Sequence, residues 1–362
     1  MNIGIIGCGN ISDQYLTNIP GLPGIKVQAC ADIVMERAKA RSMEYGIPEF
    51  LEVDELLERD DIELVVNLTI PKAHREVSTR IINAGKHIYS EKPLAIQRSD
   101  GSRILESAKK RNMMAGCAPD TFLGGGIQTC RNLIDQGAIG EPIAATAFMT
   151  NHGHEHWHPN PGFYYEVGGG PMLDMGPYYL TALINLMGPI TSVTGMTRKT
   201  FNERTITSEP LNGTKIDVEI PTHATASMRF DNGAIGTIIT SFDIWGSQLP
   251  RIEIYGTEGS LSVPDPNTFE GPVWIQSGYQ KSWSSINLTH PIGGRGLGVA
   301  DMADAIRESR QPRADISLAY HVLDVMESIN DSSNQETHVS IASVCQQPPL
   351  LKPGWIKGNF TE

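Results

Sequence analysis

The sequence lacks the features of secreted and membrane-spanning proteins. Its five cysteines are an odd number without a C-x-x-C pair, which predicts free thiols and no disulfide framework. No apolar run is long enough to span a bilayer, and the first residues predict a strand with no basic leader or small-residue cleavage site. We therefore expect a protein of the cytoplasm.

Positive charge is also scarce. Lys and Arg total 29 against 41 for Asp and Glu, a formal net charge of −12 that disfavours nucleic acid and other polyanionic partners. The chain has no internal repeat and no low-complexity linker. Its 362 residues exceed the roughly 250–300 that one hydrophobic core supports, so we expect two domains.

The first third of the chain alternates short β-branched runs with amphipathic helical stretches, the pattern of parallel βαβ units. The predicted strands are Ile3–Ile6, Lys26–Ala31, Leu64–Asn67, His87–Tyr89 and Met113–Ala118. The predicted helices are Ser12–Ile19, Met35–Tyr45, Ala73–Ala84 and Asp100–Arg111. This pattern predicts a doubly wound α/β Rossmann domain over residues 1–120.

After about residue 120, β-rich stretches follow one another through turns. The predicted strands are Ile143–Thr150, Ala224–Phe230, Ala234–Asp243, Arg251–Tyr255 and Leu261–Val263. The predicted helices are Ile127–Gln136, Tyr178–Met187, Val299–Arg307 and Leu318–Ile329, before a proline-containing irregular tail. We expect residues 121–362 to form a second, α+β domain on a largely antiparallel open sheet.

A glycine-rich turn follows the first strand and opens a helix. In the run Gly7-Cys8-Gly9-Asn10-Ile11-Ser12, the first glycine makes the turn and the second lets the backbone approach a pyrophosphate at the helix N-terminus. Ser12 replaces the usual third glycine and is small enough to keep helix and strand close. We predict dinucleotide contacts from Gly7, Gly9, Asn10 and Ile11; the alternative is a tight turn without a ligand.

Asp32 closes the second strand about twenty residues after the turn. A carboxylate there accepts hydrogen bonds from both ribose hydroxyls of NAD and repels the 2′-phosphate of NADP. No Arg or Lys follows before Arg37, so NAD is favoured over NADP. A structural alternative, compatible with this role, is that Asp32 caps the helix that begins near Val34.

Several further motifs follow in order along the chain: Thr69-Ile70-Pro71 with His74, Glu91-Lys92-Pro93, Gly168-Gly169-Gly170 leading to Asp174-Met175-Gly176-Pro177-Tyr178, and Tyr255-Gly256-Thr257-Glu258-Gly259. Their order and spacing resemble those of the Gfo/Idh/MocA oxidoreductases, which include glucose–fructose oxidoreductases and inositol dehydrogenases. The resemblance implies an NAD-dependent, metal-free hydride transfer at a hydroxyl carbon of a sugar, glycoside or cyclic polyol, by a homodimer or homotetramer. It adds Thr69, Ile70, Pro71, His74, Glu91 and Lys92 to the predicted cofactor contacts.

The same resemblance places Lys92 beside the nicotinamide and makes Asp174 and Tyr178 the acid/base segment. A phenol with an unperturbed pKa near 10 is a poor base at neutral pH, but a neighbouring ammonium favours the phenolate. We therefore predict that Lys92 and Tyr178 act together and that Asp174 orients the substrate or stabilises charge. The alternatives are an exposed loop lysine for Lys92 and a core aromatic for Tyr178.

The histidine-rich run from His152 to His158 is unusual. If it is extended, its four imidazoles share one face, which leaves a zinc site as an alternative. We favour substrate contact, since a sugar needs many polar partners and an aromatic platform. The predicted substrate-binding residues are Asp120, His154, His156, Trp157, Tyr164 and Tyr165, and no metal is predicted. Asp120 follows the last strand of the first domain, where a loop cap is the alternative.

Two other functions remain open at this stage. One is a glycoside hydrolase that uses tightly held NAD and releases no net reduced cofactor. The other is an NAD-binding sensor without turnover, which would have no need of Lys92, Asp174 and Tyr178 together.

Overall fold

The computed structural model describes residues 1–355, which form two compact units. The first unit contains residues 1–128 and 289–320 and the stretch from residue 348. The second contains residues 129–288 and 321–347. No helix of residues 1–355 is long and apolar enough to cross a membrane.

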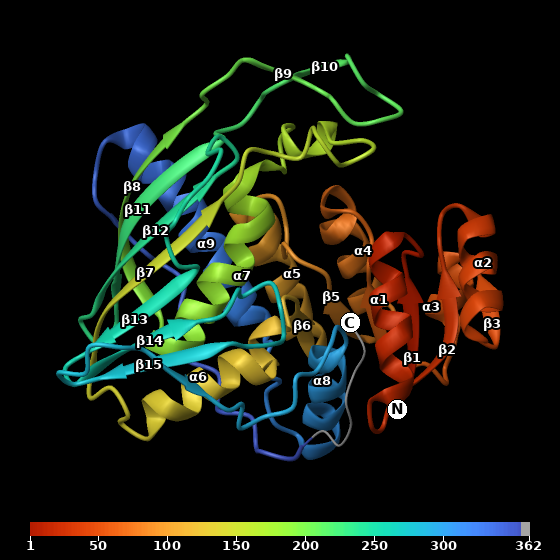
Figure 1. Ribbon diagram of the computed structural model, residues 1–362. Coiled ribbons are helices and arrows are strands. Elements are labelled where there is room, and N and C mark those ends of the chain that lie inside the picture. Colours follow the sequence, from red (N-terminus) through yellow and green to blue (C-terminus); the bar gives the residue numbers. More distant parts are fainter. Residues whose placement is uncertain (356–362) are drawn as a thin grey trace. The chain divides into compact units, whose positions relative to one another are not determined.

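The first unit is built on a six-stranded parallel sheet (Figure 1). Its spatial order is β3-β2-β1-β4-β5-β6, so the order reverses between β1 and β4. The strands are β1 Asn2–Ile6, β2 Lys26–Ala31, β3 Glu49–Leu51, β4 Leu64–Asn67, β5 His87–Ser90 and β6 Ala115–Cys117. The predicted doubly wound sheet is confirmed, and ligands of such sheets bind beyond the carboxyl ends of the strands at the point of reversal.

Helices connect these strands and pack in neighbouring pairs, α1 beside α2 and α4 beside α5. Their bounds are α1 Asn10–Asn18, α2 Met35–Tyr45, α3 Val53–Glu58, α4 Pro71–Asn83 and α5 Arg98–Arg111. The sequence did not predict β3 and α3, which are short and half-exposed. A capping box between Glu52 and Glu55 begins α3, satisfying N–H groups that a six-residue helix otherwise leaves unpaired.

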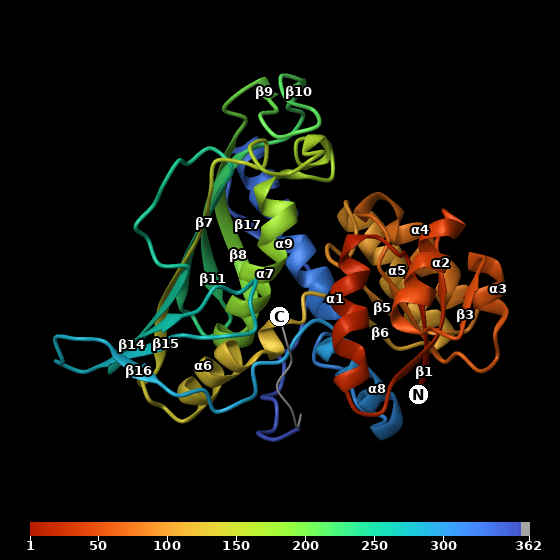
Figure 2. The same cartoon turned by 45° about the vertical axis from the view of Figure 1, so that its right-hand side comes forward.

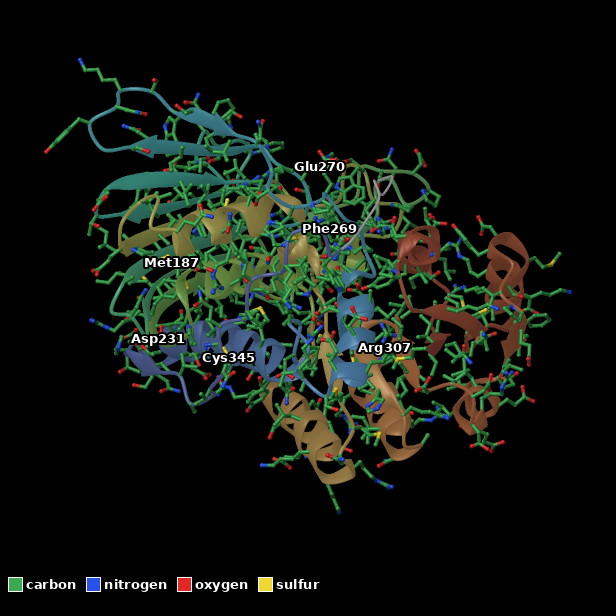
Figure 3. The ribbon with its side chains drawn as sticks, turned by 90° about the horizontal axis from the view of Figure 1, so that it is seen from below. Met187, Asp231, Phe269, Glu270, Arg307 and Cys345 are labelled. Carbon is green, nitrogen blue, oxygen red and sulfur yellow. The ribbon has the colours of Figure 1, made fainter. Side chains whose placement is uncertain are left out.

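The chain returns to the first unit late, through α8 (Leu297–Glu308). The Asp120 carboxylate accepts the N–H groups of Gly296 (2.8 Å) and Gly298 (3.1 Å) at the start of α8. Arg307, labelled in Figure 3, donates to the carbonyl oxygen of Gly24 (3.1 Å). The predicted division, which put all of 121–362 in the second domain, did not include this return.

The second unit contains a nine-stranded sheet that is antiparallel except between β7 and β12. Its order is β16-β15-β14-β13-β7-β12-β11-β8-β17. The bounds are β7 Pro142–Thr150, β8 Ile190–Arg198, β11 His223–Phe230, β12 Ile235–Ser241, β13 Ile252–Gly256, β14 Gly259–Val263, β15 Val273–Ser277, β16 Ser284–Ile286 and β17 Val339–Ser340. A separate hairpin pairs β9 (Glu203–Thr205) with β10 (Lys215–Asp217). The predicted α+β class of this domain is confirmed.

Helices cover one face of this sheet. In Figure 2, α7 (Gly170–Met187) and α9 (Ile316–Gln335) lie along one face, and no helix of residues 1–355 lies on the other. The helix α9 packs closely on β8, since a Cβ at Gly195 of β8 would lie 2.8 Å from the side chain of Ile329 of α9. A further helix, α6 (Gly125–Asp135), confirms the one predicted near residue 127.

The helix α7 positions the predicted acid/base residues. It begins at Gly170, eight residues before the predicted start. The first half of the helix was not predicted because it contains glycines and prolines, which are rare in helix interiors. Pro171 lies in its first turn, where a missing N–H costs nothing. Its other end is held near Met187, whose carbonyl oxygen accepts the Asn232 amide (3.2 Å). Figure 3 labels Met187 and Asp231 at this end of the unit.

Candidate active site

Gly7 makes the turn after β1. Its φ is +102°, and a Cβ there would lie 2.6 Å from the carbonyl carbon and oxygen of Leu68. Its N–H donates to the carbonyl oxygen of Ala31 on β2 (2.8 Å). A side chain would therefore have to push two strands apart, and only glycine fits.

Gly9 precedes α1 and has a different environment. A Cβ there would meet nothing within 4 Å, and no side chain caps the helix. Asn10 is exposed and Ile11 is half-buried, whereas the Ser12 hydroxyl is buried and donates back to the carbonyl oxygen of Gly9 (2.6 Å). The first turn of α1 thus presents backbone N–H groups to open space, as a bound diphosphate requires.

Asp32 is buried at the end of β2. One carboxylate oxygen accepts the N–H of Cys8 in the glycine turn (2.8 Å), and the other accepts the N–H of Val34, the residue before α2 (2.8 Å). Val34 is itself the N-cap residue of α2 and no side chain caps this helix, so Asp32 fixes the turn before α2 and does not cap the helix. The contact of Asp32 with a ribose stays a prediction. The two backbone N–H groups fix the orientation of the carboxylate that would make it.

The residues after β4 form the next part of this edge. Asn67 accepts both the N–H and the hydroxyl of Thr69 (3.2 and 2.7 Å), Ile70 is 66% exposed, and Pro71 begins α4. His74 is fully buried, and burial lowers its pKa. Its ring nitrogens lie 2.6 Å from the carbonyl oxygen of Pro93 and 2.9 Å from that of Thr69. His74 therefore ties together the loops after β4 and β5.

Glu91 and Lys92 follow β5 and differ in burial. The Glu91 carboxylate is buried and accepts the Tyr15 hydroxyl from α1 (2.7 Å) and the Lys92 N–H (2.9 Å). Lys92 is partly exposed. Glu91 thus orients the loop that carries Lys92, and its partner Tyr15, whose spacing from Glu91 gives no sequence signal, was not predicted.

Asp120 is fully buried in the first unit. Besides Gly296 and Gly298, it faces the guanidinium of Arg295 at 3.6 Å. Burial raises its pKa, while Arg295 and the two N–H groups oppose this shift. These partners match the loop-cap alternative, and the structure leaves no exposed surface of Asp120 for the predicted substrate contact.

Asp174 and Tyr178 lie one helical turn apart on α7, so their side chains emerge on the same face. Asp174 is partly exposed, and Tyr178 is 5% exposed. The neighbouring Tyr179 is fully buried. The acid/base role of Asp174 and Tyr178 stays a prediction.

The segment from His152 to His158 is a turn, so the expectation of an extended strand is wrong. Gly153 has a φ of +84°, and the N–H groups of Trp157 and His158 both bond to the carbonyl oxygen of His154 (3.3 and 3.0 Å). The four imidazoles consequently do not share a face. Within residues 1–355, no group of three or more His, Cys, Asp or Glu side chains is arranged to hold a metal ion.

Instead, the imidazoles contact different aromatic rings. His152 stacks on Trp245 with ring centroids 3.4 Å apart, and His154 stacks on Tyr164 at 3.8 Å. Burial lowers the pKa of His154 to about 4, an effect that the Asp174 carboxylate opposes. His154 is therefore neutral at pH 7 and lies within electrostatic reach of Asp174. His156 and Trp157 are exposed.

A buried charge network holds this segment, and sequence reasoning missed it. The Glu155 carboxylate accepts the Tyr165 hydroxyl (2.5 Å) and pairs with Arg204 (3.0 Å), which also pairs with Asp243. Tyr165 is fully buried, and burial with the Glu155 hydrogen bond raises its pKa strongly. Tyr165, a predicted substrate contact, therefore belongs to the framework. The bonded partners of this network are up to 49 residues apart in the sequence, so no local sequence pattern predicts their contacts.

Comparisons with known proteins agree with this architecture. Residues 1–118 match the family model described as oxidoreductase family, NAD-binding Rossmann fold, and residues 127–262 match the GFO/IDH/MocA C-terminal domain. Myo-inositol 2-dehydrogenase of Thermotoga maritima is 24% identical over 262 residues, covering 72% of this chain and 74% of that protein. The 1,5-anhydro-D-fructose reductase of Ensifer adhaerens is 27% identical over 264 residues, covering 71% and 74%.

Among solved structures, levoglucosan dehydrogenase in complex with NADH and L-sorbose is similar, with a TM-score of 0.82 at 21% identity, covering 95% of this chain and 99% of that one. The predicted resemblance, the oxidoreductase class and the NAD cofactor are thereby confirmed. With a glycine turn shaped for a dinucleotide and both family models matched in order, this chain belongs to the Gfo/Idh/MocA family of NAD-binding oxidoreductases.

Proposed function

We propose that this protein is an NAD-dependent dehydrogenase that oxidises a hydroxyl carbon of a sugar, glycoside or cyclic polyol. The observation that carries the proposal is the pair Asp174 and Tyr178, one turn apart on α7, downstream of an NAD-binding domain. The names of the relatives support it, since inositols and anhydrosugars are polyhydroxylated rings.

The residues at the edge of the first sheet fit NAD. The open space above Gly9 and the first turn of α1, with Asn10 and Ile11, would hold the diphosphate, and Asp32 would bind the ribose hydroxyls. We assign Thr69, Ile70 and Pro71 to the same cofactor; of these, Ile70 is the most exposed. His74 and Glu91 serve it indirectly, by fixing the loops that carry these residues and Lys92.

NAD supplies a hydride acceptor, so that the C–H bond of the carbinol gives a hydride and the carbon becomes a carbonyl. Tyr178 takes the hydroxyl proton. Lys92 supplies the positive charge that favours the phenolate of Tyr178, and Asp174 accepts a hydrogen bond from the substrate and orients it. His154, neutral at pH 7, His156 and Trp157 contact the sugar, with Tyr164 stacked behind His154.

The test is a panel of inositols, aldoses and glycosides with NAD or NADP, followed by the near-ultraviolet absorbance of the reduced nicotinamide. We expect turnover of at least one member with NAD and weaker turnover with NADP. Asp32→Ala should reduce the preference for NAD over NADP, because the carboxylate that repels the 2′-phosphate is lost. Tighter binding of NADP than of NAD by the wild-type protein would show that Asp32 has been misassigned.

The two alternatives predict different results in the same assay. A hydrolase that uses bound NAD cleaves a glycoside without accumulating NADH, and a sensor binds NAD and a sugar without chemical change. Retention of Lys92, Asp174 and Tyr178 favours the dehydrogenase over the sensor, because binding alone needs no acid/base pair.

We further propose that the protein works in the cytoplasm as a homo-oligomer, paired through the open face of the nine-stranded sheet. All five cysteines are free and buried, as a reducing compartment requires. The open face exposes Met196, Ile235 and Trp274. Light scattering should give a dimer or tetramer, and Ile235→Asp should weaken it; a wild-type monomer would contradict this proposal.

A further inference from the structure

The second unit contains a pocket that the proposed catalytic residues do not line. It has a volume of about 670 Å³ and lies beside β9, next to the ends of β7 and β12. Among its lining residues are His152, His156, Phe201, Thr205, Thr207 and Trp245. The volume is within the range of about 300–1,000 Å³ typical of small-molecule sites.

Aromatic rings line part of this pocket. Trp245 is 85% exposed even though its ring stacks on His152 at 3.4 Å with an interplanar angle of 15°. The stack fixes the indole against His152 and leaves most of its surface open. Phe201, also exposed, is held under the guanidinium of Arg204 at 4.9 Å. Flat, exposed aromatic faces held in this way suit the apolar C–H face of a sugar ring.

Polar groups line the rest of the pocket. Along the segment after Glu203, Arg204, Ile206 and Ser208 are buried, whereas Thr205 and Thr207 are exposed. This alternation places both threonine side chains on the exposed side of the segment, among the pocket residues. The Thr207 hydroxyl also donates to the carbonyl oxygen of Glu155 (3.4 Å), which leaves its oxygen as an acceptor for a ligand. With His156, they supply donors and acceptors for a polyhydroxylated ligand.

The charges of the pocket disfavour an anion. Its one guanidinium, Arg204, is already paired with the buried carboxylates of Glu155 and Asp243. Glu203 is paired with Lys215 (2.6 Å). Among the described residues that line the pocket, no Lys or further Arg side chain is present to balance a phosphate or a carboxylate, so the chemistry of the pocket fits a neutral ligand.

The histidine-rich turn connects this pocket to the proposed acid/base residues. His154 lies within electrostatic reach of Asp174, whereas its neighbours His152, Glu155 and His156 line the pocket. Two regions of one ligand could thus contact the two sides of a single seven-residue segment.

We propose that the pocket binds a neutral sugar ring and serves as a second sugar subsite, so that the substrate is a disaccharide or longer glycoside. The inference that this ring is part of the substrate rests on the proposed function. The inference that Trp245 and Phe201 bind a sugar is independent of the proposed function.

The test is calorimetric titration of the NAD-loaded protein with glucose, maltose, cellobiose, lactose and sucrose. We expect at least one disaccharide to bind about tenfold or more tightly than glucose. Trp245→Ala should remove that difference, Trp245→Tyr should retain part of it, and Thr207→Val should reduce it. Glucose binding should change little in all three variants.

Trp283→Ala is the matched control, because Trp283 is also exposed but does not line the pocket. Since Trp245 is 85% exposed, Trp245→Ala should unfold at the wild-type temperature, and a shared melting temperature shows that the fold is intact. Equal affinity for glucose and every disaccharide, or a disaccharide preference that survives Trp245→Ala, would overturn the proposal.

The same titrations separate this proposal from the proposed function. If a disaccharide binds through Trp245 but no probe is oxidised, the sugar pocket stands and the dehydrogenase assignment fails. If glucose or an inositol is oxidised and no disaccharide binds more tightly, the dehydrogenase stands and the second subsite fails.

Discussion

The edge of the first sheet and the histidine-rich turn of the second unit are specified in different ways. At the sheet edge, Gly7, Gly9 and Asp32 do what their local sequence requires: a turn, an open helix end and a carboxylate that closes a strand. In the turn, Glu155 is fixed by Arg204 and His152 by Trp245, both distant in sequence. The first region is therefore readable from local sequence, whereas the second depends on contacts between distant segments.

The largest expected effect comes from removing one proposed catalytic group from each unit. Lys92→Met and Tyr178→Phe should each lower kcat by about 10²–10⁴-fold, as expected for lost acid–base catalysis, with much smaller changes in NAD affinity. If the two residues act together, as we propose, the double variant should lose far less than the product of the two single losses. If Tyr178→Phe keeps nearly full turnover, the tyrosine only packs in the core.

The next largest effect should come from breaking the charge network behind the histidine-rich turn. Arg204→Met leaves Glu155 and Asp243 buried without their cation, which should lower the free energy of unfolding by about 3–5 kcal/mol. Lys215→Met is the matched control, because its pair with Glu203 is exposed and is worth about 1 kcal/mol or less. Equal losses in urea denaturation would contradict the structural role of Arg204.

Substitution of two glycines at the edge of the first sheet should affect different properties, stability for Gly7 and NAD affinity for Gly9. Gly7→Ala should destabilise the protein by about 1–3 kcal/mol, because φ is +102° and a Cβ would meet the Leu68 backbone. Gly9→Ala should leave the melting temperature nearly unchanged and weaken NAD binding, since a Cβ there enters only the space assigned to the cofactor. Unchanged NAD affinity in Gly9→Ala would show that the diphosphate does not lie there.

His154 should make the stability depend on pH, an effect that is confined to acidic solution. Because burial lowers its pKa to about 4, the unfolded chain binds a proton below about pH 6.5 that the folded protein does not. Stability should therefore fall as the pH drops from about 6.5 to 4, by up to about 3 kcal/mol from this residue. His154→Gln should flatten the curve over that window, measured by urea denaturation, and an unchanged slope would contradict the burial argument.

Local patterns predicted most of the first unit and less of the second. Strands such as β1 and β4 are almost entirely buried and mostly apolar, and their prediction holds to within one residue. In contrast, β8 was missed because one of its faces is open and carries Thr194 and Met196 instead of a clear alternation. The sequence also did not predict that α8 belongs to the first unit, because its place there depends on a contact between Asp120 and Gly296, which are 176 residues apart.

The same limit applies to the candidate site. The glycine turn and Asp32 have a fixed spacing and were found from it, whereas His152–His158 was predicted to be extended when Gly153 makes it turn. Asp120 and Tyr165 were assigned to substrate from their positions in the sequence, but both are fully buried. Burial depends on contacts between distant segments, so a sequence pattern alone did not separate framework from site.

In the proposed reaction, a hydride passes from a hydroxyl carbon of the substrate to NAD. The most direct measurement uses a substrate from the panel that carries deuterium on the oxidised carbon, with mass analysis of the nicotinamide cofactor. We predict one deuterium in each NADH formed and NADH accumulating well beyond one equivalent per protein. Product formation with NADH that is unlabelled, or that never accumulates, would contradict the claim.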